Sequence, residues 1–377
     1  MWKIPLFDVS FGNEEIEAVS HVVKSGWLSM GKITQEFENQ LSNFLGSKYC
    51  FAVSNGTAAL HIANVALGIG YRDEVICPSF TFVAGANSIT YTGASPIFAD
   101  IESTSNFCIS PSDIEKKITD RTKAIQVMHY AGYPCNLESI MKIATKYNLF
   151  VIEDAAHSIG TIYNGKKIGT FGDIGCFSFF SNKNLSVGEG GLVVTNNSSI
   201  ADKIKLLRSH GMTTLTWDRL QGHAFSYDVV NKGYNYRTNE ISSAIGLIQL
   251  KKLVEKNKKR ETLVEYYKQL LFNCSFIHIP FMKYAGKSSF HIFPVLLEHD
   301  INRDQFMLYL KKHGIQTSIH YPPIHKFSAY KQYKNDTLPI TDEIGKKEVT
   351  LPLYPDMKLS DIDYIVQTIN TFKGEAL

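Results

Sequence analysis

The sequence predicts an α/β protein built on a mostly parallel sheet with helices on both faces. Between residues 50 and 152, short apolar segments typical of buried strands alternate with longer segments that have helical spacing. Small polar and ionisable residues follow several of these strand segments. The chain has 377 residues, more than one average core requires, so we expect a larger and a smaller domain.

The composition is ordinary for a soluble globular protein, with 44% hydrophobic and 20% charged residues. The net charge of +3 and the lack of a long basic run argue against nucleic-acid binding. The six cysteines are scattered without metal-site spacing, which indicates buried reduced thiols and no metal centre. We find neither a signal-peptide core nor an apolar run of membrane-spanning length, so we expect a cytoplasmic protein without membrane partners.

The larger domain is expected over residues 1–250 and begins with an N-terminal arm and two amphipathic helices at 13–23 and 37–44. Strands are expected at 50–53, 74–77, 96–100, 124–128, 149–152, 174–180 and 192–195. Helices are expected directly after residue 54, at 82–90, 137–147 and 200–208, and from a cap at Asn239. The connection between the last two strands is too short for a crossover helix. We therefore expect an antiparallel return through the glycines at 188, 190 and 191.

The smaller domain is expected over residues 251–377 as an α+β unit. Its lysine-rich start, 251–260, is interpreted as a solvated helix face that marks the boundary. A strand at 290–297, a helix at 303–312 and a strand at 315–320 follow. A rigid loop at 321–325 and a closing helix at 360–372, capped by Ser360, complete the unit.

Four side chains lie just past predicted strand ends, where ligands bind in parallel α/β sheets: Thr57, Phe82, His129 and Asp154. One cleft could hold them all. The segment 54–60 places backbone N–H groups at a helix N-terminus, which favours a phosphate. A plain helix N-cap explains the same residues.

A carboxylate at a strand end and a lysine on a nearby loop suit pyridoxal phosphate (PLP), which needs both groups. Lys183 would form the Schiff base, and Asp154 would keep the ring nitrogen protonated. The phosphate would take donors from Ser178, Thr57 and the amides around Gly56. Phe82 would stack on the ring, and His157 would contact the phenolic oxygen. The alternatives stay open at this point: Glu153 and Asp154 as surface caps, Lys183 as a solvated lysine and Phe82 as core.

Several segments together resemble one known family. They are VSNGTAAL at 53–60, PSFTFVAGANSI at 78–89, IEDAAHSIG at 152–160, FSFFSNKNLSVGEGGLVVTNN at 177–197 and GYNYRTNEISSAIGLIQL at 233–250. The chain is similar to the DegT/DnrJ/EryC1/StrS family of PLP-dependent nucleotide-sugar aminotransferases. The similarity extends from GWLSMG at 26–31 to HYPPIH at 320–325. It implies the aspartate aminotransferase fold, fold type I, with a mostly parallel seven-stranded sheet in the large domain.

The resemblance also implies roles for the residues at matching positions. Lys183 would bind the cofactor covalently, and Asp154 would contact its ring nitrogen. His157 would bond the phenolic oxygen, and Phe82 would stack on the cofactor ring. Phosphate binding would fall to Gly56, Thr57, Ala58 and Ser178. Asn235 is expected to reach the phosphate of a neighbouring subunit, which implies a homodimer with shared active sites. Segments that often approach the sugar or nucleotide contain His210, Tyr321 and His325.

The implied reaction is a ping-pong transamination in which L-glutamate or L-glutamine converts PLP to pyridoxamine phosphate (PMP). A nucleotide-linked keto-sugar would then accept the amine, by analogy a 4-keto-6-deoxyhexose for a surface polysaccharide such as lipopolysaccharide O-antigen or for a natural product. A 3-keto-sugar acceptor is the alternative. Family dehydratases carry histidine in place of the lysine, so Lys183 favours transamination over dehydration. A non-enzymatic regulator is a third alternative, against which the Lys183/Asp154 pair argues.

Overall fold

The computed structural model describes residues 2–372 apart from 215–221, 223–225, 285 and 334–336. Its main sheet has seven strands in the order β1-β11-β10-β7-β6-β2-β3. Their bounds are β1 Tyr49–Val53, β2 Glu74–Pro78, β3 Ser95–Ala99, β6 Thr122–Met128, β7 Phe150–Asp154, β10 Ile174–Ser178 and β11 Gly191–Thr195. Only β11 runs antiparallel to its neighbours. The predicted α/β class and the antiparallel return from β10 to β11 are confirmed.

Helices cover both faces of this sheet because its strands are apolar on both sides. On one face, Ile152 and Val193 pack with α3 (Gly56–Ala66), α4 (Ala84–Thr90) and α7 (Ser198–Leu207). On the other face, Val151 and Val194 pack with α2 (Lys32–Leu45), α6 (Leu137–Tyr147) and α9 (Glu240–Leu271). Neighbouring strand residues thus enter different cores, as the two-residue period of a strand requires. The side chains at the carboxyl ends of the strands are left to form a site.

A smaller three-stranded antiparallel sheet is formed by β12 (Ile277–His278), β13 (Phe293–Leu297) and β14 (Glu348–Leu351). It is accompanied by α10 (Arg303–Lys312), α11 (Pro339–Lys347) and α12 (Leu359–Asn370). The strand predicted at 315–320 is wrong: that segment makes only the isolated bridges Ile4↔Ile315 and Ser318↔Thr350. The closing helix is capped at Lys358 rather than Ser360, because the Asp361 side chain accepts the Lys358 N–H at 2.9 Å.

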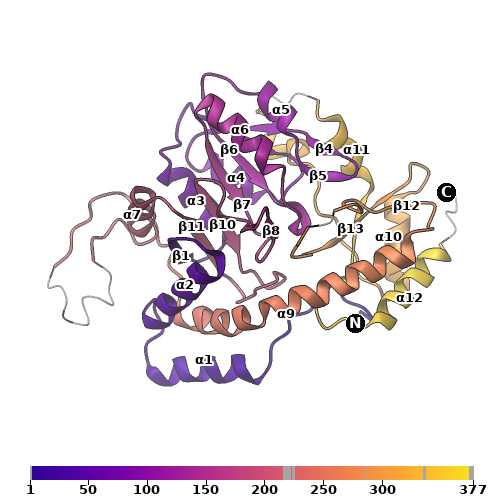
Figure 1. The fold of residues 1–377 in the computed structure, drawn as a ribbon, viewed down its shortest axis with the longest axis horizontal. Coiled ribbons are helices and arrows are strands. Elements are labelled where there is room, and N and C mark those ends of the chain that lie inside the picture. The colour runs from indigo at the N-terminus through magenta and orange to yellow at the C-terminus, as the bar shows by residue number, and fades with distance from the viewer. Residues whose placement is uncertain (1, 215–221, 223–225, 285, 334–336, 373–377) are drawn as a thin grey trace.

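Helix α9 links the two sheets in one continuous element of 32 residues (Figure 1). It runs without a break across the predicted domain boundary at 250/251. The predicted solvated face at 251–260 is wrong for two of its cations, Lys256 and Arg260, which are buried. Lys256 Nζ donates to the Ser10 carbonyl at 2.8 Å, and Arg260 donates to the carbonyls of His291 and Leu353, both at 3.1 Å. Backbone oxygens therefore compensate the burial of these charges.

The remaining described elements are short or peripheral, and most were not predicted. They are α1 (Asn13–Ser25), β4 (Ile101–Ser103), β5 (Asn106–Ile109), α5 (Pro111–Lys116), β8 (Ile162–Tyr163), β9 (Lys166–Lys167) and the 3₁₀ helices η1 (Tyr130–Gly132), η2 (Ile324–Lys326) and η3 (Ser328–Tyr330). Helix α1 lies along α9 at the edge of the molecule (Figure 1). Within the described part of the chain, no helix combines the length and apolarity that crossing a bilayer requires.

Candidate active site

A cavity of about 400 Å³ lies at the carboxyl ends of the main-sheet strands. It is lined by residues that follow β1, β2, β7 and β10, and by His320 and Tyr321 from the C-terminal part of the chain. Eight of the predicted site residues line it together: Gly56, Thr57, Phe82, Asp154, His157, Ser178, Lys183 and Tyr321.

Asp154 is the last residue of β7, and its side chain is 6% exposed. Its Oδ1 accepts the Ala156 N–H at 3.1 Å. Burial raises the pKa of Asp154, and the Ala156 N–H and the charge of Lys183 only partly oppose this effect. A cation bound in the cavity, such as a protonated ring nitrogen, would relieve this unfavourable burial.

Glu153 has a different role from its neighbour, because successive strand residues point to opposite faces. Its carboxylate is fully buried and accepts the N–H groups of Gly169, Phe171 and Gly172 at 2.7 to 2.9 Å. It also lies 3.1 Å from His129 Nε2. Burial alone would raise the pKa of Glu153, but the bonds from His129 and these amides hold it below its usual value. Glu153 fastens the loop at 169–172 and takes no part in the cavity.

His129 is consequently not a site residue, and the expectation that one cleft holds it with Thr57, Phe82 and Asp154 is wrong. Its Nδ1 accepts the Cys135 N–H at 3.1 Å, so its Nε2 carries the proton that it donates to Glu153. The imidazole is fully buried.

Lys183 lies on the loop between β10 and β11, where its N–H donates to the Phe180 carbonyl at 2.8 Å. Burial lowers the pKa of its amine to about 8, although Asp154 opposes the shift. At pH 7 about a tenth of an amine with this pKa is neutral, far more than of an ordinary lysine, and the neutral form is the one that acts as nucleophile or base. Its Nζ lies 3.4 Å from His291 Nε2.

The N-terminus of α3 faces Ser178 across a narrow gap. Asn55 caps the helix by accepting the Ala58 N–H at 2.8 Å, so the amide of Ala58 is engaged within the helix start. Ala58 is buried and lies outside the cavity lining, whereas Gly56 and Thr57 line it. A Cβ on Gly56 would approach Ser178 Cβ to 2.9 Å, so only glycine fits here. The helix dipole, the Thr57 and Ser178 hydroxyls and this close approach suit a phosphate.

His157, Tyr321 and Phe82 form the other side of the cavity. His157 Nδ1 accepts the Ala131 N–H at 3.3 Å, and its Nε2 lies 2.9 Å from Tyr321 Oη. Burial lowers the pKa of His157 well below its usual value, so the ring is neutral and its proton sits on Nε2. The Phe82 ring is 54% exposed at the cavity and 5.8 Å from the Tyr321 ring. An aromatic ring left this open is available to cover a bound planar group.

Besides Ala58, three predicted residues lie outside this cavity. His325 is packed between Ser79 Oγ at 2.7 Å and Asp342 Oδ1 at 2.9 Å. His210 and Asn235 are exposed and lie on paired segments linked by the Ser209↔Asn235 bridge. Neither of them lines the cavity of its own chain.

Sequence reasoning missed His291 and His320. His320 lines the cavity, and its Nδ1 lies 2.9 Å from Thr350 Oγ1. It stands beside Tyr321 in the HYPPIH segment, which was the available signal. His291 lies just before β13, and only the fold brings it to Lys183.

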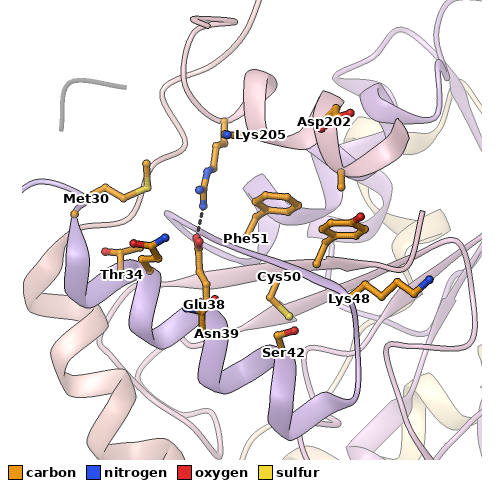
Figure 2. A pocket seen from close by; sticks show the side chains of 15 residues that line it. Met30, Thr34, Glu38, Asn39, Ser42, Lys48, Cys50, Phe51, Asp202 and Lys205 are labelled. Carbon is orange, nitrogen blue, oxygen red and sulfur yellow. Dashed lines mark hydrogen bonds and ion pairs between the residues drawn. The ribbon is translucent and has the colours of Figure 1, made fainter. Parts of the chain in front are cut away.

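A second cavity of about 450 Å³ lies between α2, β1 and α7, as Figure 2 shows. None of the predicted site residues lines it. Glu38 points from α2 into it (Figure 2). Its carboxylate makes an ion pair with Arg208. Because this ion pair satisfies its main buried charges, we place the chemistry in the cavity that contains Lys183.

The comparisons with known proteins identify the family. A family model of the DegT/DnrJ/EryC1/StrS aminotransferase family matches residues 9–370. The chain belongs to this family. As a DegT/DnrJ/EryC1/StrS aminotransferase it has the predicted fold type I, and it is an enzyme.

Similar family members are known from several bacteria. The spore coat polysaccharide biosynthesis protein SpsC of Bacillus subtilis is 37% identical, over 98% of this chain and 95% of SpsC. Helicobacter pylori PseC, an aminotransferase involved in the biosynthesis of pseudoaminic acid, is 31% identical with a TM-score of 0.91. That match covers 97% of this chain and 98% of PseC.

Spr1654 of Streptococcus pneumoniae has been solved in a PLP-form and in a PMP-form. The two structures match with TM-scores of 0.90 and 0.91, at 28% identity, over 98% of each chain. PLP is also the cofactor of the protein described in this structure, and the residues around its 400 Å³ cavity fit the group. Lys183 would supply the amine, Asp154 a buried carboxylate that the charge of Lys183 only partly stabilises, and Gly56 the close approach to Ser178.

Proposed function

We propose that this aminotransferase moves an amino group from L-glutamate or L-glutamine to a nucleotide-linked keto-sugar. The observation that carries the proposal is the shared cavity of Lys183 and Asp154, next to the phosphate cradle at Gly56 and Ser178. An amine, a carboxylate and a phosphate site at these positions match the three ends of PLP.

PLP, when bound, supplies an aldehyde and an electron-withdrawing ring that accept and deliver the amino group. Asp154 would hold the ring-nitrogen proton, and Thr57 with Ser178 would bind the phosphate. The Nε2 proton of His157 would be donated toward the phenolic oxygen, and Phe82 would cover the ring. The Lys183 amine, with its pKa near 8, would take and return the proton at the substrate carbon.

The sugar class is supported by the relatives, since PseC is an aminotransferase of pseudoaminic acid biosynthesis and SpsC acts in spore coat polysaccharide biosynthesis. We propose a 4-keto-6-deoxyhexose acceptor, and an amino-sugar product destined for a surface polysaccharide or a natural product. A 3-keto-sugar is the second candidate acceptor. The lysine at position 183 favours transamination over the dehydration carried out by family members with histidine there.

We further propose a homodimer whose active sites are shared. Asn235 is exposed and does not line the cavity of its own chain, which supports a role at the phosphate of a neighbouring subunit. His210, on the paired segment, would approach the same neighbouring site.

The test is amine transfer between defined substrates. Purified enzyme with PLP is given L-glutamate or L-glutamine and a panel of nucleotide-linked 4-keto-6-deoxyhexoses and 3-keto-hexoses, and products are identified by mass spectrometry and NMR. A 4-amino product supports the proposal. A 3-amino product would identify the 3-keto-sugar as the acceptor instead. A deoxygenated sugar without nitrogen would show that the enzyme is a dehydratase and would overturn the proposal.

A further inference from the structure

His291 and Asn184 lie behind the lysine that holds the cofactor, and both are buried. His291 Nε2 is 3.4 Å from Lys183 Nζ, and His291 Nδ1 is 2.9 Å from Asn184 Oδ1. Helix α9 fixes the backbone here, because Arg260 donates to the His291 carbonyl at 3.1 Å. The imidazole is therefore held in place independently of anything bound in the cavity.

The hydrogen-bond network determines which nitrogen of His291 carries the proton. Asn257 Nδ2 donates to the Ile159 carbonyl at 3.0 Å, so Asn257 Oδ1 is an acceptor. Asn184 Nδ2 donates to that oxygen at 2.8 Å and to the Ser289 carbonyl at 2.7 Å. A flipped Asn184 would place its oxygen against the Ser289 oxygen, so its Oδ1 must face His291.

An amide oxygen can only accept, and so His291 Nδ1 must be the protonated nitrogen. Burial, with the neighbouring His157 and Lys183, lowers the pKa of His291 well below its usual value, and the ring is neutral. Its Nε2 consequently presents a lone pair to Lys183. His157, whose ring centroid is 4.2 Å away, has the opposite tautomer and offers a proton to the cavity.

We propose that His291 is a positioning residue for Lys183, and that Asn184 sets the tautomer this role requires. Whenever the lysine nitrogen is not bound to cofactor, His291 Nε2 accepts a hydrogen bond from it. The bond holds Nζ at a fixed point of the cavity wall, with its lone pair available to a carbonyl carbon. It also keeps the amine from turning toward the Asp154 carboxylate.

The inference rests on the role of Lys183 proposed above, and two matched variants test it. In His291→Asn the shorter amide can still occupy the Nδ1 position and bond Asn184, but it cannot reach Lys183. In His291→Gln the amide oxygen can take the place of Nε2. Full-length enzyme stripped of cofactor is mixed with PLP, and the amine condenses with the aldehyde as one water leaves. Borohydride trapping then gives the rate of this covalent capture.

We expect capture to slow about tenfold in His291→Asn and to recover to within about threefold of wild type in His291→Gln, as for one lost hydrogen bond. PMP, which binds without Lys183, should bind both variants and wild type equally. Capture at the wild-type rate in His291→Asn, or PMP binding weakened by the same factor as capture, would overturn the inference. Lys183→Ala separates the two claims, because continued trapping in that variant would instead overturn the role of Lys183.

The tautomer can be observed directly in wild-type enzyme stripped of cofactor and labelled with ¹⁵N-histidine. The His291 signals are identified by their loss in His291→Asn. The pattern of a neutral ring protonated at Nδ1 is expected. An Nε2-protonated or doubly protonated ring would contradict the proposal.

Discussion

Glu153 and Asp154 are adjacent in β7, yet their surroundings shift the pKa values of the two carboxylates in opposite directions. Amides and His129 surround Glu153 and lower its pKa, whereas burial raises the pKa of Asp154 because one amide N–H and the charge of Lys183 only partly oppose it. One carboxylate therefore stabilises the fold in its charged form. The other is kept available for a cation that arrives with the cofactor, at some cost to the cofactor-free protein.

Isosteric amides at the two positions should separate these roles. Glu153→Gln is expected to lower the free energy of unfolding by about 2–4 kcal/mol, because the hydrogen bonds that three amides and His129 donate to a buried carboxylate are weakened or lost. Asp154→Asn should leave cofactor-free stability at pH 7 equal or higher, since it removes a disfavoured buried charge, while transamination is lost. Urea unfolding of both cofactor-free proteins and an activity assay check this. A more severe loss of stability in Asp154→Asn would contradict it.

The lowered pKa of Glu153 also predicts an acid limit. Its stabilising effect is fully present above its unfolded pKa of 4.5 and is lost as the pH falls through the lower folded value. The gap in unfolding free energy between wild type and Glu153→Gln should therefore narrow below about pH 4.5. If this difference in unfolding free energy were constant from pH 7 to pH 3, the charge of the Glu153 carboxylate could not be its cause.

Phe82 and its near neighbour Phe80 offer a matched pair, since Phe80 is 1% exposed and Phe82 is 54% exposed. Phe80→Ala should destabilise the protein by about 3–5 kcal/mol, as expected for a truncated core phenylalanine. Phe82→Ala should change stability by less than about 1 kcal/mol but weaken PLP binding about tenfold, because ring contact is lost. PLP titration followed by fluorescence measures the affinity. An unchanged affinity for PLP in Phe82→Ala would show that Phe82 does not stack on the cofactor.

Tyr321 orients the neutral imidazole of His157, because its Oη lies 2.9 Å from His157 Nε2 and accepts the proton of that nitrogen. Tyr321→Phe keeps the ring beside Phe82 and removes only this hydroxyl. We expect kcat/KM for the amino donor to fall about tenfold, with unfolding changed by less than about 1 kcal/mol. Single-turnover spectroscopy of the donor half-reaction gives the rate. A wild-type rate would show that the hydroxyl does not matter to the site.

Shared active sites can be tested by mixing two inactive variants. Lys183→Ala lacks the amine, and Asn235→Asp should repel the phosphate of the neighbouring site. In equal mixtures, hybrid dimers contain one intact site, so about a quarter of wild-type activity should appear after subunit exchange. Each variant incubated alone is the control. Mixtures that remain inactive would mean that each chain builds its site alone.

The fold was largely predictable from the sequence because apolar periodicity dictates which segments are buried on both faces. The strand predicted at 315–320 was wrong because Ile315 and Ser318 each pair with a single residue of a distant segment, Ile4 and Thr350, and form no ladder. The cations of α9 were misread because their partners, the carbonyls of Ser10, His291 and Leu353, are remote in the chain. Sequence spacing carries no signal for such long-range contacts.

The candidate site was predictable where chemistry sits close to a strand end, as at Thr57, Asp154, Ser178 and Lys183. His129 met the same criterion and was misassigned, because its direction depends on the amide of Cys135 and on Glu153. His291 was missed for the opposite reason, since no local motif marks it and the packing of β13 against α9 brings it to Lys183.

The central claim is that Lys183 carries the cofactor and the proton of the transfer. Its most direct test is borohydride reduction of the PLP-loaded enzyme, followed by peptide mass spectrometry and by the same treatment of Lys183→Ala. We expect a phosphopyridoxyl group on Lys183 alone, and in Lys183→Ala no visible cofactor band and no turnover. A label on another lysine, or full activity in Lys183→Ala, would contradict it.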